Sequence, residues 1–463
     1  MGKKRKTIPC RLKFVFLIVF IEIVLRVNDM DYDSGKYQQV KDVLEKKKGK
    51  FLLRGWIKRK RDLKGNIFLV LRDGSGEVQC ILEKDKTKGI DDAVKALVES
   101  TVIVSGEAKK DERAPEGVEL IVSNFEVIAF SEEFPIGRDL SESFLMDVRH
   151  LWLRSKKLST ALKVNASLFK SFREFMELKG YTEVQGPEFV SGAVEGGSTL
   201  FEVPYFGKKV YLSQSNQFYL ETFLTGFERV YSIMPSFRAE KSRTRRHLTE
   251  FWHAEAEASW MQLPELMKFE QDMIQFFAKS IAEQHPKELK YFGRDPKELM
   301  HVAETKFERY SYDEVLQMAQ KKFKNLEWGN DLGEKEEREI TKDFKVPIIV
   351  HHYPGKLKPF YHRPNPEDEG KTVLCTDVLA PEGYGEIIGG GERCWELKEI
   401  LERMKAEKID PKPYQWYVDL RKYSAHPHSG FGLGLSRTLT WLCNLEHIRD
   451  VIPYPRTMNR YYP

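Results

Sequence analysis

The first regular pattern along the chain is an alternation of apolar and polar residues that begins near Phe51. Five short segments carry it, at residues 51–57, 67–73, 78–82, 102–106 and 119–122. Period-two alternation is typical of strands that bury one face, whereas the stretch near 91–100 has helical character. The segment from Met30 to Lys50 predicts a short charged helix ahead of the first strand. The pattern therefore predicts a small β-rich domain over residues 30–130.

Five short strands with one intervening helix fit an OB-fold barrel. Its first turn carries the basic run Lys58-Arg59-Lys60-Arg61, and Phe68 lies on the adjoining strand. OB-folds bind single-stranded nucleic acid by stacking bases on aromatic rings above a basic groove. The alternative is that Phe68 is a core residue and the basic run is solvated.

Beyond the barrel the pattern changes. Residues 131–150 contain Pro135, Gly137 and several acids, which predict a hinge. Helical periodicity runs from Leu151 to Leu178 and returns in two later stretches. Short apolar segments typical of strands lie between and after them. We predict a second domain over 151–463 with an inserted helical region around 264–330, whose helices are expected at 264–283 and 313–323.

Composition narrows the choice of function. The 463 residues carry 75 Lys and Arg against 70 Asp and Glu, a net charge of +5, which excludes a histone-like polycation. Nucleic-acid contacts must therefore come from local patches. The cysteines are odd in number, scattered and without metal-ligand spacing: Cys10, Cys80, Cys375, Cys394 and Cys443. This usage predicts a reducing compartment, which we take as the cytoplasm, and no structural zinc.

Residues 1–29 combine a basic run, Lys3 to Lys6, with the apolar run Phe14 to Ile21. That order is typical of a signal peptide, but no small-residue cleavage site follows and Glu22 interrupts the apolar run. A membrane span needs about 20 apolar residues, more than are present here. We predict a dispensable extension ahead of an alternative start at Met30 and no stable membrane association, while a membrane or organelle address is the alternative.

The richest candidate for chemistry is the stretch from Phe237 to Phe251. Strand-like segments flank it, so the pattern predicts two strands joined by a long polar loop. Guanidinium groups suit a polyphosphate because they stay charged and bind oxygens in pairs. Taken alone, the stretch could also be a solvated basic hairpin.

Two glycine-rich segments support the first interpretation. One is Gly385–Arg393, which joins an acid, Glu386, to three consecutive glycines and an Arg. The other is Gly430–Arg437, which leads into an apolar helix. Glycines allow a backbone to pass close to a ligand, although each segment by itself is weak evidence.

The three segments, in this order, resemble the signature motifs of class II aminoacyl-tRNA synthetases of the aspartate/asparagine/lysine subgroup. The resemblance runs from about Phe51 to the C-terminus. It implies an α+β protein, with an N-terminal OB-fold β-barrel that binds the anticodon and a catalytic domain built on an antiparallel sheet flanked by helices. It also implies ATP as substrate, Mg²⁺ as cofactor and a homodimer formed through Leu151–Pro187. Neither a Walker-type loop nor a dinucleotide fingerprint is present.

By the same resemblance, Arg238, Glu386 and Arg437 are the catalytic residues and Glu386 holds Mg²⁺. The expected ATP-binding residues are Arg238, Glu240, Arg246, His247, Leu248, Phe251, Glu386, Gly434, Leu435, Ser436 and Arg437. Ser436 departs from the subgroup, which usually has an acid there. Gly389 stands where the aspartate enzymes often have Ser, which leaves the number of Mg²⁺ ions open.

The expected amino-acid-binding residues are Glu195, Gln217, Glu221, Arg238, Gly389, Arg393 and His428. The aspartate enzymes carry a Lys where this chain has Leu220, and Glu221 follows it. A carboxylate facing the pocket accepts from an amide and repels aspartate, and an unmatched buried charge costs several kcal/mol. The resemblance therefore favours L-asparagine and tRNA(Asn) as substrates.

In the barrel, Arg61, Phe68 and Gln79 match the anticodon-binding residues of the subgroup. The resemblance implies that Phe68 stacks on the central uridine and that Gln79 reads its edge. Three other functions stay open: an aspartate-specific sister enzyme, an asparagine synthetase-like paralogue of the same fold, and a non-enzymatic RNA-binding relative. The barrel argues against the second, and the retained phosphate ligands argue against the third.

Overall fold

The structure is a computed structural model that describes residues 35–137, 140–192, 199–241 and 244–463. The chain divides between Leu140 and Ser141 into two compact units. This boundary falls inside the predicted hinge, and the second half of that segment is helical, with α4 at Glu142–Asp147 and α5 at Arg149–Trp152. The predicted extension at residues 1–29 lies outside the described residues.

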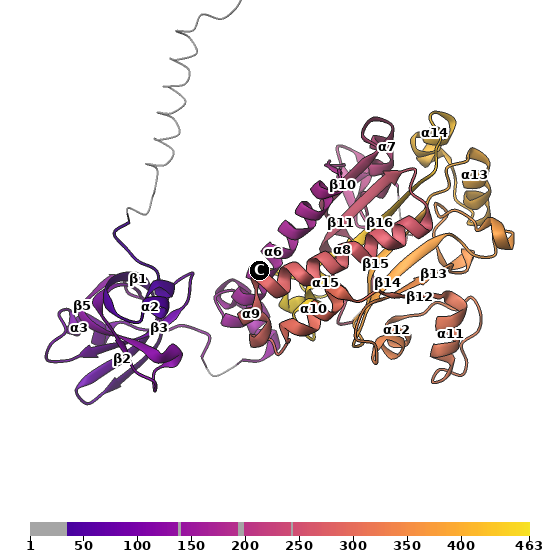
Figure 1. The fold of residues 1–463 in the computed structure, drawn as a ribbon. Helices are drawn as coiled ribbons and strands as arrows, with labels where there is room; N and C mark the ends of the chain where they lie inside the picture. The colour runs from indigo at the N-terminus through magenta and orange to yellow at the C-terminus, as the bar shows by residue number, and fades with distance from the viewer. Residues whose placement is uncertain (1–34, 138–139, 193–198, 242–243) are drawn as a thin grey trace, which may run out of the picture. The chain divides into compact units, whose positions relative to one another are not determined.

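The first unit is a closed five-stranded barrel with the strand order β1-β2-β3-β5-β4 (Figure 1). All neighbours are antiparallel except β3 and β5, which are parallel. The strands are β1 Gly49–Leu63, β2 Asn66–Arg72, β3 Glu77–Glu83, β4 Thr101–Lys110 and β5 Val118–Ala129. The predicted OB-fold is confirmed.

The barrel closes because alternate side chains point inward. In β2, Ile67, Leu69 and Leu71 are buried, while the residues between them are half-exposed. Helix α2 (Val40–Lys46) adds two valines to the same core. The helices are shorter than the sequence predicts, since the described part of the 30–50 segment is helical only in α2, and α3 covers Ile90–Lys95.

The second unit is built on an eight-stranded sheet with the order β12-β13-β14-β15-β16-β11-β10-β6. The six central strands are antiparallel, and the two edge pairs, β12–β13 and β10–β6, are parallel. The bounds are β6 Thr182–Glu183, β10 Arg229–Phe237, β11 Glu250–Ser259, β12 Glu308–Ser311, β13 Ile348–His351, β14 Cys375–Ala380, β15 Gly385–Glu392 and β16 His428–Gly434. The predicted sheet is confirmed, with parallel pairing added at its edges.

Long helices cover one face of this sheet (Figure 1). Helix α6 (Lys156–Leu178) packs against α8 (Leu263–Gln284) through buried aromatic rings, with Phe175 edge-to-face against Phe269. Helix α15 (Leu435–Leu442) completes this layer with buried Trp441. Aromatic and aliphatic burial of this kind dominates the stability of large cores.

Helix α8 confirms the helix predicted at 264–283, and α11 (Tyr312–Gln320) confirms the one predicted at 313–323. The two differ in position, because α8 belongs to the main core and α11 packs in a separate cluster with β13 and α12 (Glu334–Thr341). That residues 264–330 form an insertion stays a prediction.

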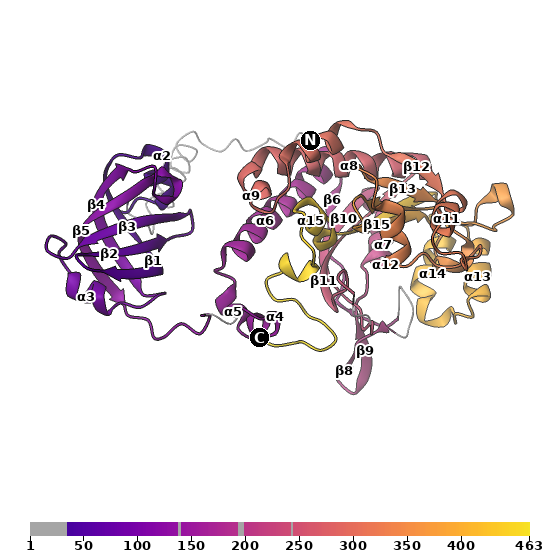
Figure 2. The ribbon, with the colours of Figure 1, turned by 90° about the horizontal axis from the view of Figure 1, so that it is seen from below.

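The remaining helices lie around these layers: α7 Gln217–Phe227, α9 Pro286–Tyr291, α10 Pro296–Glu304, α13 Leu397–Ala406 and α14 Gln415–Lys422. A small three-stranded sheet is formed by β7 Phe189–Val190, β8 Glu202–Tyr205 and β9 Lys208–Leu212, and its β8–β9 hairpin projects from the body of the unit (Figure 2). Among the described helices, none combines the length and apolar character needed to cross a membrane.

Candidate active site

The strand register places one row of residues across four adjacent strands. Asp377 pairs with Gly389, Gly389 pairs with Gly432, and Gly432 pairs with Glu255. Paired residues in adjacent strands point to the same face of a sheet. The row therefore has acids at its ends and no side chains in its middle, which leaves a hollow on the sheet.

At two positions of β16 only glycine fits, because side chains of β11 occupy the space that a Cβ would need. A Cβ at Gly430 would lie 2.0 Å from Oε1 of Glu257, and a Cβ at Gly432 would lie 2.5 Å from Nε2 of His253. The side chains of β11 thus lie across β16 and form part of the floor of the hollow. The glycine-rich segment of the sequence is explained by this close approach.

A first cavity lies at one end of the hollow and collects most of the residues predicted to bind ATP. Its lining consists of Arg238, Glu240, Arg246, His247, Leu248, Phe251, His253, Glu386, Ile387, Gly432, Gly434, Ser436, Arg437 and Ile448. Of the predicted set only Leu435 is absent, because its side chain is fully buried in the core. Three segments that are distant in sequence therefore meet in one cavity.

Arg437 and Glu386 face each other in this cavity. Nη1 of Arg437 lies 2.9 Å from Oε2 of Glu386. Burial opposes ionisation of Glu386, but Arg437, Lys358 and other nearby cations outweigh it and hold the pKa of this carboxyl below its usual value. Glu386 thus orients Arg437, although the neighbouring position holds Ser436 in place of the subgroup's usual acid.

Glu337, which was not among the predicted site residues, holds two of these segments together. Its Oε2 accepts from Nη1 of Arg246 at 2.6 Å and from the backbone N–H of Glu386 at 2.9 Å. Both side chains of the ion pair are largely buried. A charged helix such as 334–341 gives no sequence signal for this role, because only the fold turns one of its several acids toward the cavity.

A second cavity, of about 450 Å³, continues the hollow and falls in the size range of small-molecule sites. It shares Arg238, His253, Glu386 and Gly432 with the first cavity. Its other lining residues are Ser215, Gln217, Glu255, Asp331, Leu357, Lys358, Pro359, Tyr361, His362, Asp377, Gly389, Gly390 and Arg393. Ligands in the two cavities would meet beside Arg238.

Four of the predicted amino-acid-binding residues line this second cavity: Gln217, Arg238, Gly389 and Arg393. Glu195 lies outside the described residues. Glu221 and His428 are buried and do not line the cavity, which differs from the expectation that the Glu221 carboxylate faces it.

The carboxylate of Glu221 is instead occupied by internal partners. It accepts from Nη2 of Arg421 at 2.6 Å, from the hydroxyl of Tyr417 at 2.8 Å and from Nε2 of Gln217 at 3.1 Å, and it lies 3.0 Å from Nε2 of His428. Burial opposes the charge, yet Arg421 and His428 outweigh it and keep the pKa of Glu221 below its usual range. Glu221 therefore acts on the cavity through Gln217.

Glu257, also missed from sequence, pairs with Arg393 deep in the sheet. Nε and Nη2 of Arg393 donate to its carboxylate, the latter at 2.5 Å. Among the described residues, Nη1 of Arg393 has no hydrogen-bond partner. Arg393 thus presents a donor to the cavity while its charge is balanced from behind.

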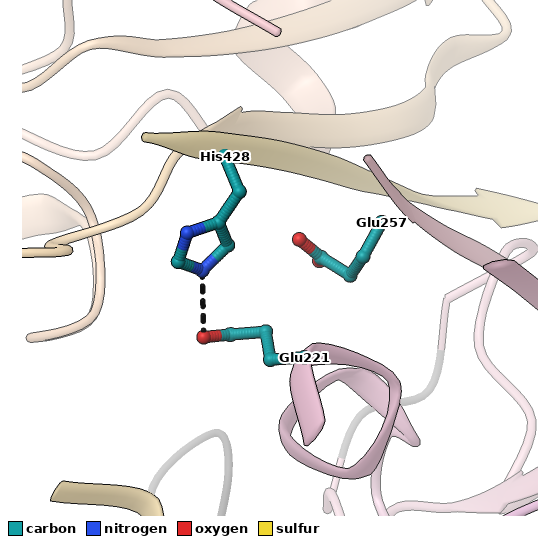
Figure 3. A group of neighbouring side chains, drawn as sticks. All are labelled: Glu221, Glu257 and His428. Atoms are coloured by element: carbon teal, nitrogen blue, oxygen red, sulfur yellow. Dashed lines mark hydrogen bonds and ion pairs between the residues drawn. The ribbon is translucent and has the colours of Figure 1, made fainter. Parts of the chain in front are cut away.

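Glu221, Glu257 and His428 come close together, with potential ligand atoms within 4.8 Å of one another (Figure 3). Arg421 and Arg393 already neutralise the two carboxylates. A cation between them would add charge to a balanced and fully buried cluster. These residues therefore form a layer of paired charges next to the second cavity and not a metal site.

In the barrel, Arg61, Phe68 and Gln79 lie on the outer face of three adjacent strands. Arg61 pairs with Phe68 across β1 and β2, and Gln79 pairs with Val70, two residues further along β2. Phe68 is half-exposed, whereas its neighbours Ile67 and Leu69 are buried. The register thus brings the three predicted residues together and rules out a core position for Phe68.

Residues 141–458 match the family of class II tRNA synthetases (D, K and N), and residues 51–128 match the OB-fold nucleic acid binding domain. The chain belongs to the class II tRNA synthetases of this family. Within it, the chain belongs to the asparagine–tRNA ligases, as its relatives show.

The asparagine–tRNA ligase of Thermoplasma acidophilum is 48% identical over 416 residues, which cover 89% of this chain and 96% of that protein. The enzyme of Thermococcus kodakarensis is 46% identical over 91% of this chain and 98% of that protein. The crystal structure of asparaginyl-tRNA synthetase from Pyrococcus horikoshii, complexed with asparaginyl-adenylate, aligns with a TM-score of 0.88 at 45% identity and covers 92% of this chain and 99% of that chain.

If the first cavity binds ATP as the sequence predicts, replacing Glu337 by Gln should weaken that binding, because Arg246 loses the charge that holds it in the cavity. We expect the KM for ATP to rise about tenfold, equivalent to about 1.4 kcal/mol, with a smaller change in kcat. Steady-state kinetics at varied ATP would measure this. Glu339→Gln on the same helix, which removes an acid paired with Lys322 and Lys342, is the control. Equal effects of both variants would refute the role of Glu337.

Replacing Glu221 by Gln should destabilise the catalytic unit by about 3–5 kcal/mol, since Arg421 would stay buried without its counter-charge. Denaturant unfolding followed by fluorescence would measure the loss. Glu202→Gln removes an acid of an exposed pair with Lys209 and should change little. A Glu221→Gln protein as stable as the wild type would show that the pair contributes nothing net.

Proposed function

We propose that the chain activates L-asparagine with ATP and transfers the asparaginyl group to tRNA(Asn) in protein synthesis. The observation that supports this best is the junction of the two cavities at Arg238, His253, Glu386 and Gly432. A nucleotide in one cavity and an amino acid in the other would bring two anionic groups together at a guanidinium.

In the first step an oxygen of the asparagine carboxylate attacks the α-phosphorus of ATP. The bond from that phosphorus to the bridging oxygen breaks, and pyrophosphate leaves with its electron pair. No protein nucleophile is needed, so positioning and charge stabilisation carry the rate. Arg238 neutralises both reacting anions, while Arg246, His247 and Arg437 hold the β- and γ-phosphates.

Phe251 and Arg437 are the groups proposed to cover the two faces of adenine. Phe251 is half-buried at the edge of the core, and the guanidinium of Arg238 lies 5.3 Å from the centre of its ring. A ring held in this way presents a fixed surface for stacking. Glu240 is proposed to accept from adenine or from a neighbouring group of the loop.

The residues present fit a Mg²⁺ ion. A Cβ at Gly389 would lie 3.4 Å from an oxygen of Asp377 and 3.4 Å from one of Glu386, so two carboxylates approach one point of the cavity. Nζ of Lys358 donates to both oxygens of Asp377, at 2.8 and 2.6 Å, which makes Glu386 the principal ligand. When bound, the ion would neutralise phosphate oxygens, as Mg²⁺ does with one or two carboxylates.

Selection of asparagine over aspartate is proposed to rest on Gln217 and Arg393. Nε2 of Gln217 is bound by Glu221, so its side-chain oxygen is the group left to accept from a substrate amide. Nη1 of Arg393 would donate to the amide oxygen. Because Glu257 and Glu221 balance the nearby cations, an aspartate carboxylate would bring an uncompensated charge into a buried site.

In the second step a hydroxyl of the terminal ribose of tRNA attacks the carbonyl carbon of the adenylate and gives up its proton to solvent. The bond from that carbon to the phosphate oxygen breaks, and AMP leaves with the electron pair. The outer face of the barrel, with Arg61, Phe68 and Gln79, is proposed to bind the anticodon. A half-exposed ring beside a cation suits an unpaired base.

We also propose that the protein works as a homodimer through the Leu151–Pro187 region and in the cytoplasm. Leu178, at the end of α6 in this region, is 74% exposed and is accessible to a second copy. The described cysteines are free and buried, as suits a reducing compartment.

ATP–pyrophosphate exchange without tRNA tests the proposed function. We expect exchange with asparagine and none with aspartate, and we expect Arg238→Ala to abolish it while circular dichroism stays unchanged. Exchange with aspartate would overturn the substrate, and absence of exchange with every amino acid would overturn the enzyme.

Phe68→Ala should weaken tRNA charging by about 1–3 kcal/mol, the value of one base stack, and leave exchange unaffected. The KM for tRNA in an aminoacylation assay would measure it. Val70→Ala, on the same face of β2 but not aromatic, is the matched control. If Phe68→Ala reduces exchange as much as charging, the barrel does not bind the anticodon in this way.

A further inference from the structure

A third cavity, of about 500 Å³, adjoins the first cavity, in which ATP is proposed to bind, at the end where its phosphates would lie. The two share Arg246, Arg437 and Ile448 as lining residues. Both arginines are proposed above to hold the β- and γ-phosphates of ATP. The third cavity therefore begins where the leaving group of the first step would be released.

The lining of the third cavity is strongly basic, with seven Arg and Lys side chains against three Glu. Arg246 and Arg437 are paired with Glu337 and Glu386. Arg245 and Lys345 form no ion pair with any residue that the structure describes, and both are exposed. The outer part of the cavity thus keeps an excess of positive charge.

One wall of this cavity is rigid. The side chain of Arg294 is only 4% exposed and donates to Glu298 at 3.0 Å, to Glu382 at 2.8 Å and to the carbonyl of Trp441 at 3.0 Å. A guanidinium fixed in this way stays in one position, and its partners form no ion pair with Arg245 or Lys345 among the described residues. The cavity therefore combines a buried, hydrogen-bonded guanidinium in its wall with the exposed cationic side chains of Arg245 and Lys345.

We propose that this cavity is the exit site for inorganic pyrophosphate, an inference that rests on the proposed function. Once the adenylate occupies the first two cavities, the anion has to leave past Arg246 and Arg437. A basic surface on their far side attracts a polyanion and lowers the free-energy barrier to its release. Pyrophosphate binds there more tightly than orthophosphate, because it carries more charge and more acceptor oxygens.

Charge reversal at the mouth tests the proposal kinetically. Lys345→Glu should raise the KM for pyrophosphate in the exchange reaction about fivefold, the size expected for reversing one partly solvated charge near a polyanion. The KM values for ATP and asparagine should stay unchanged. Lys335→Glu makes the same change of net charge at an exposed position of α12 outside the cavity and should have no effect. Equal effects of the two variants, or none in either, would overturn the exit site.

Direct binding separates this site from the nucleotide cavity and does not need enzyme activity. Isothermal titration of the full-length protein with pyrophosphate, in the presence of a saturating non-hydrolysable ATP analogue, should still show binding. That binding should be weakened about fivefold in Lys345→Glu and should be weaker for orthophosphate in the wild type. Complete displacement by the analogue would overturn the proposal. Loss of exchange with every amino acid while this binding persists would overturn the proposed function alone.

Discussion

The catalytic unit depends on the balance of charges that it buries. Two carboxylates, Glu221 and Glu257, are matched by Arg421 and Arg393 within a layer that is almost closed to solvent. An ion without a partner is expensive in such surroundings, so each group constrains the position of the next. The segments that carry these groups, namely α7, β11, α14 and the residue directly after β15, are thereby held in one arrangement around the second cavity.

This balance also shapes the chemistry. A pocket for a neutral amide has to contain hydrogen-bond donors and acceptors without offering net charge. Arg393 meets that requirement, because Glu257 neutralises its charge on the side away from the cavity. At the other end of the hollow three guanidinium groups, those of Arg238, Arg246 and Arg437, line the first cavity, which suits the triphosphate proposed to bind there. One sheet thus presents two different cavities, which share Arg238 and Glu386 among their lining residues.

The hollow itself exists because β15 and β16 place glycines where a sheet normally carries side chains. Gly389 and Gly432 leave the centre of the row open, and acids flank it on β14 and β11. The same row explains why the site is rigid: its floor is hydrogen-bonded strand and its far side is the aromatic core of α6 and α8. A loop would not position reacting groups as closely.

Much of this architecture could be predicted from the sequence. Period-two alternation predicted the barrel strands, and the resemblance carried by the glycine and arginine motifs predicted residues that the fold brings together in the first cavity. Helix bounds were less certain, as short charged segments such as 30–50 lack a strong periodic signal. What the sequence could not determine was which acids turn inward. Glu221 was expected in the cavity and lies behind it, while Glu257, Glu337 and Asp377 escaped notice. The type of a residue and its spacing along a strand or helix are local properties and can be read from the chain. The partner that neutralises a buried charge comes from a distant segment, and only the tertiary structure decides which one it is.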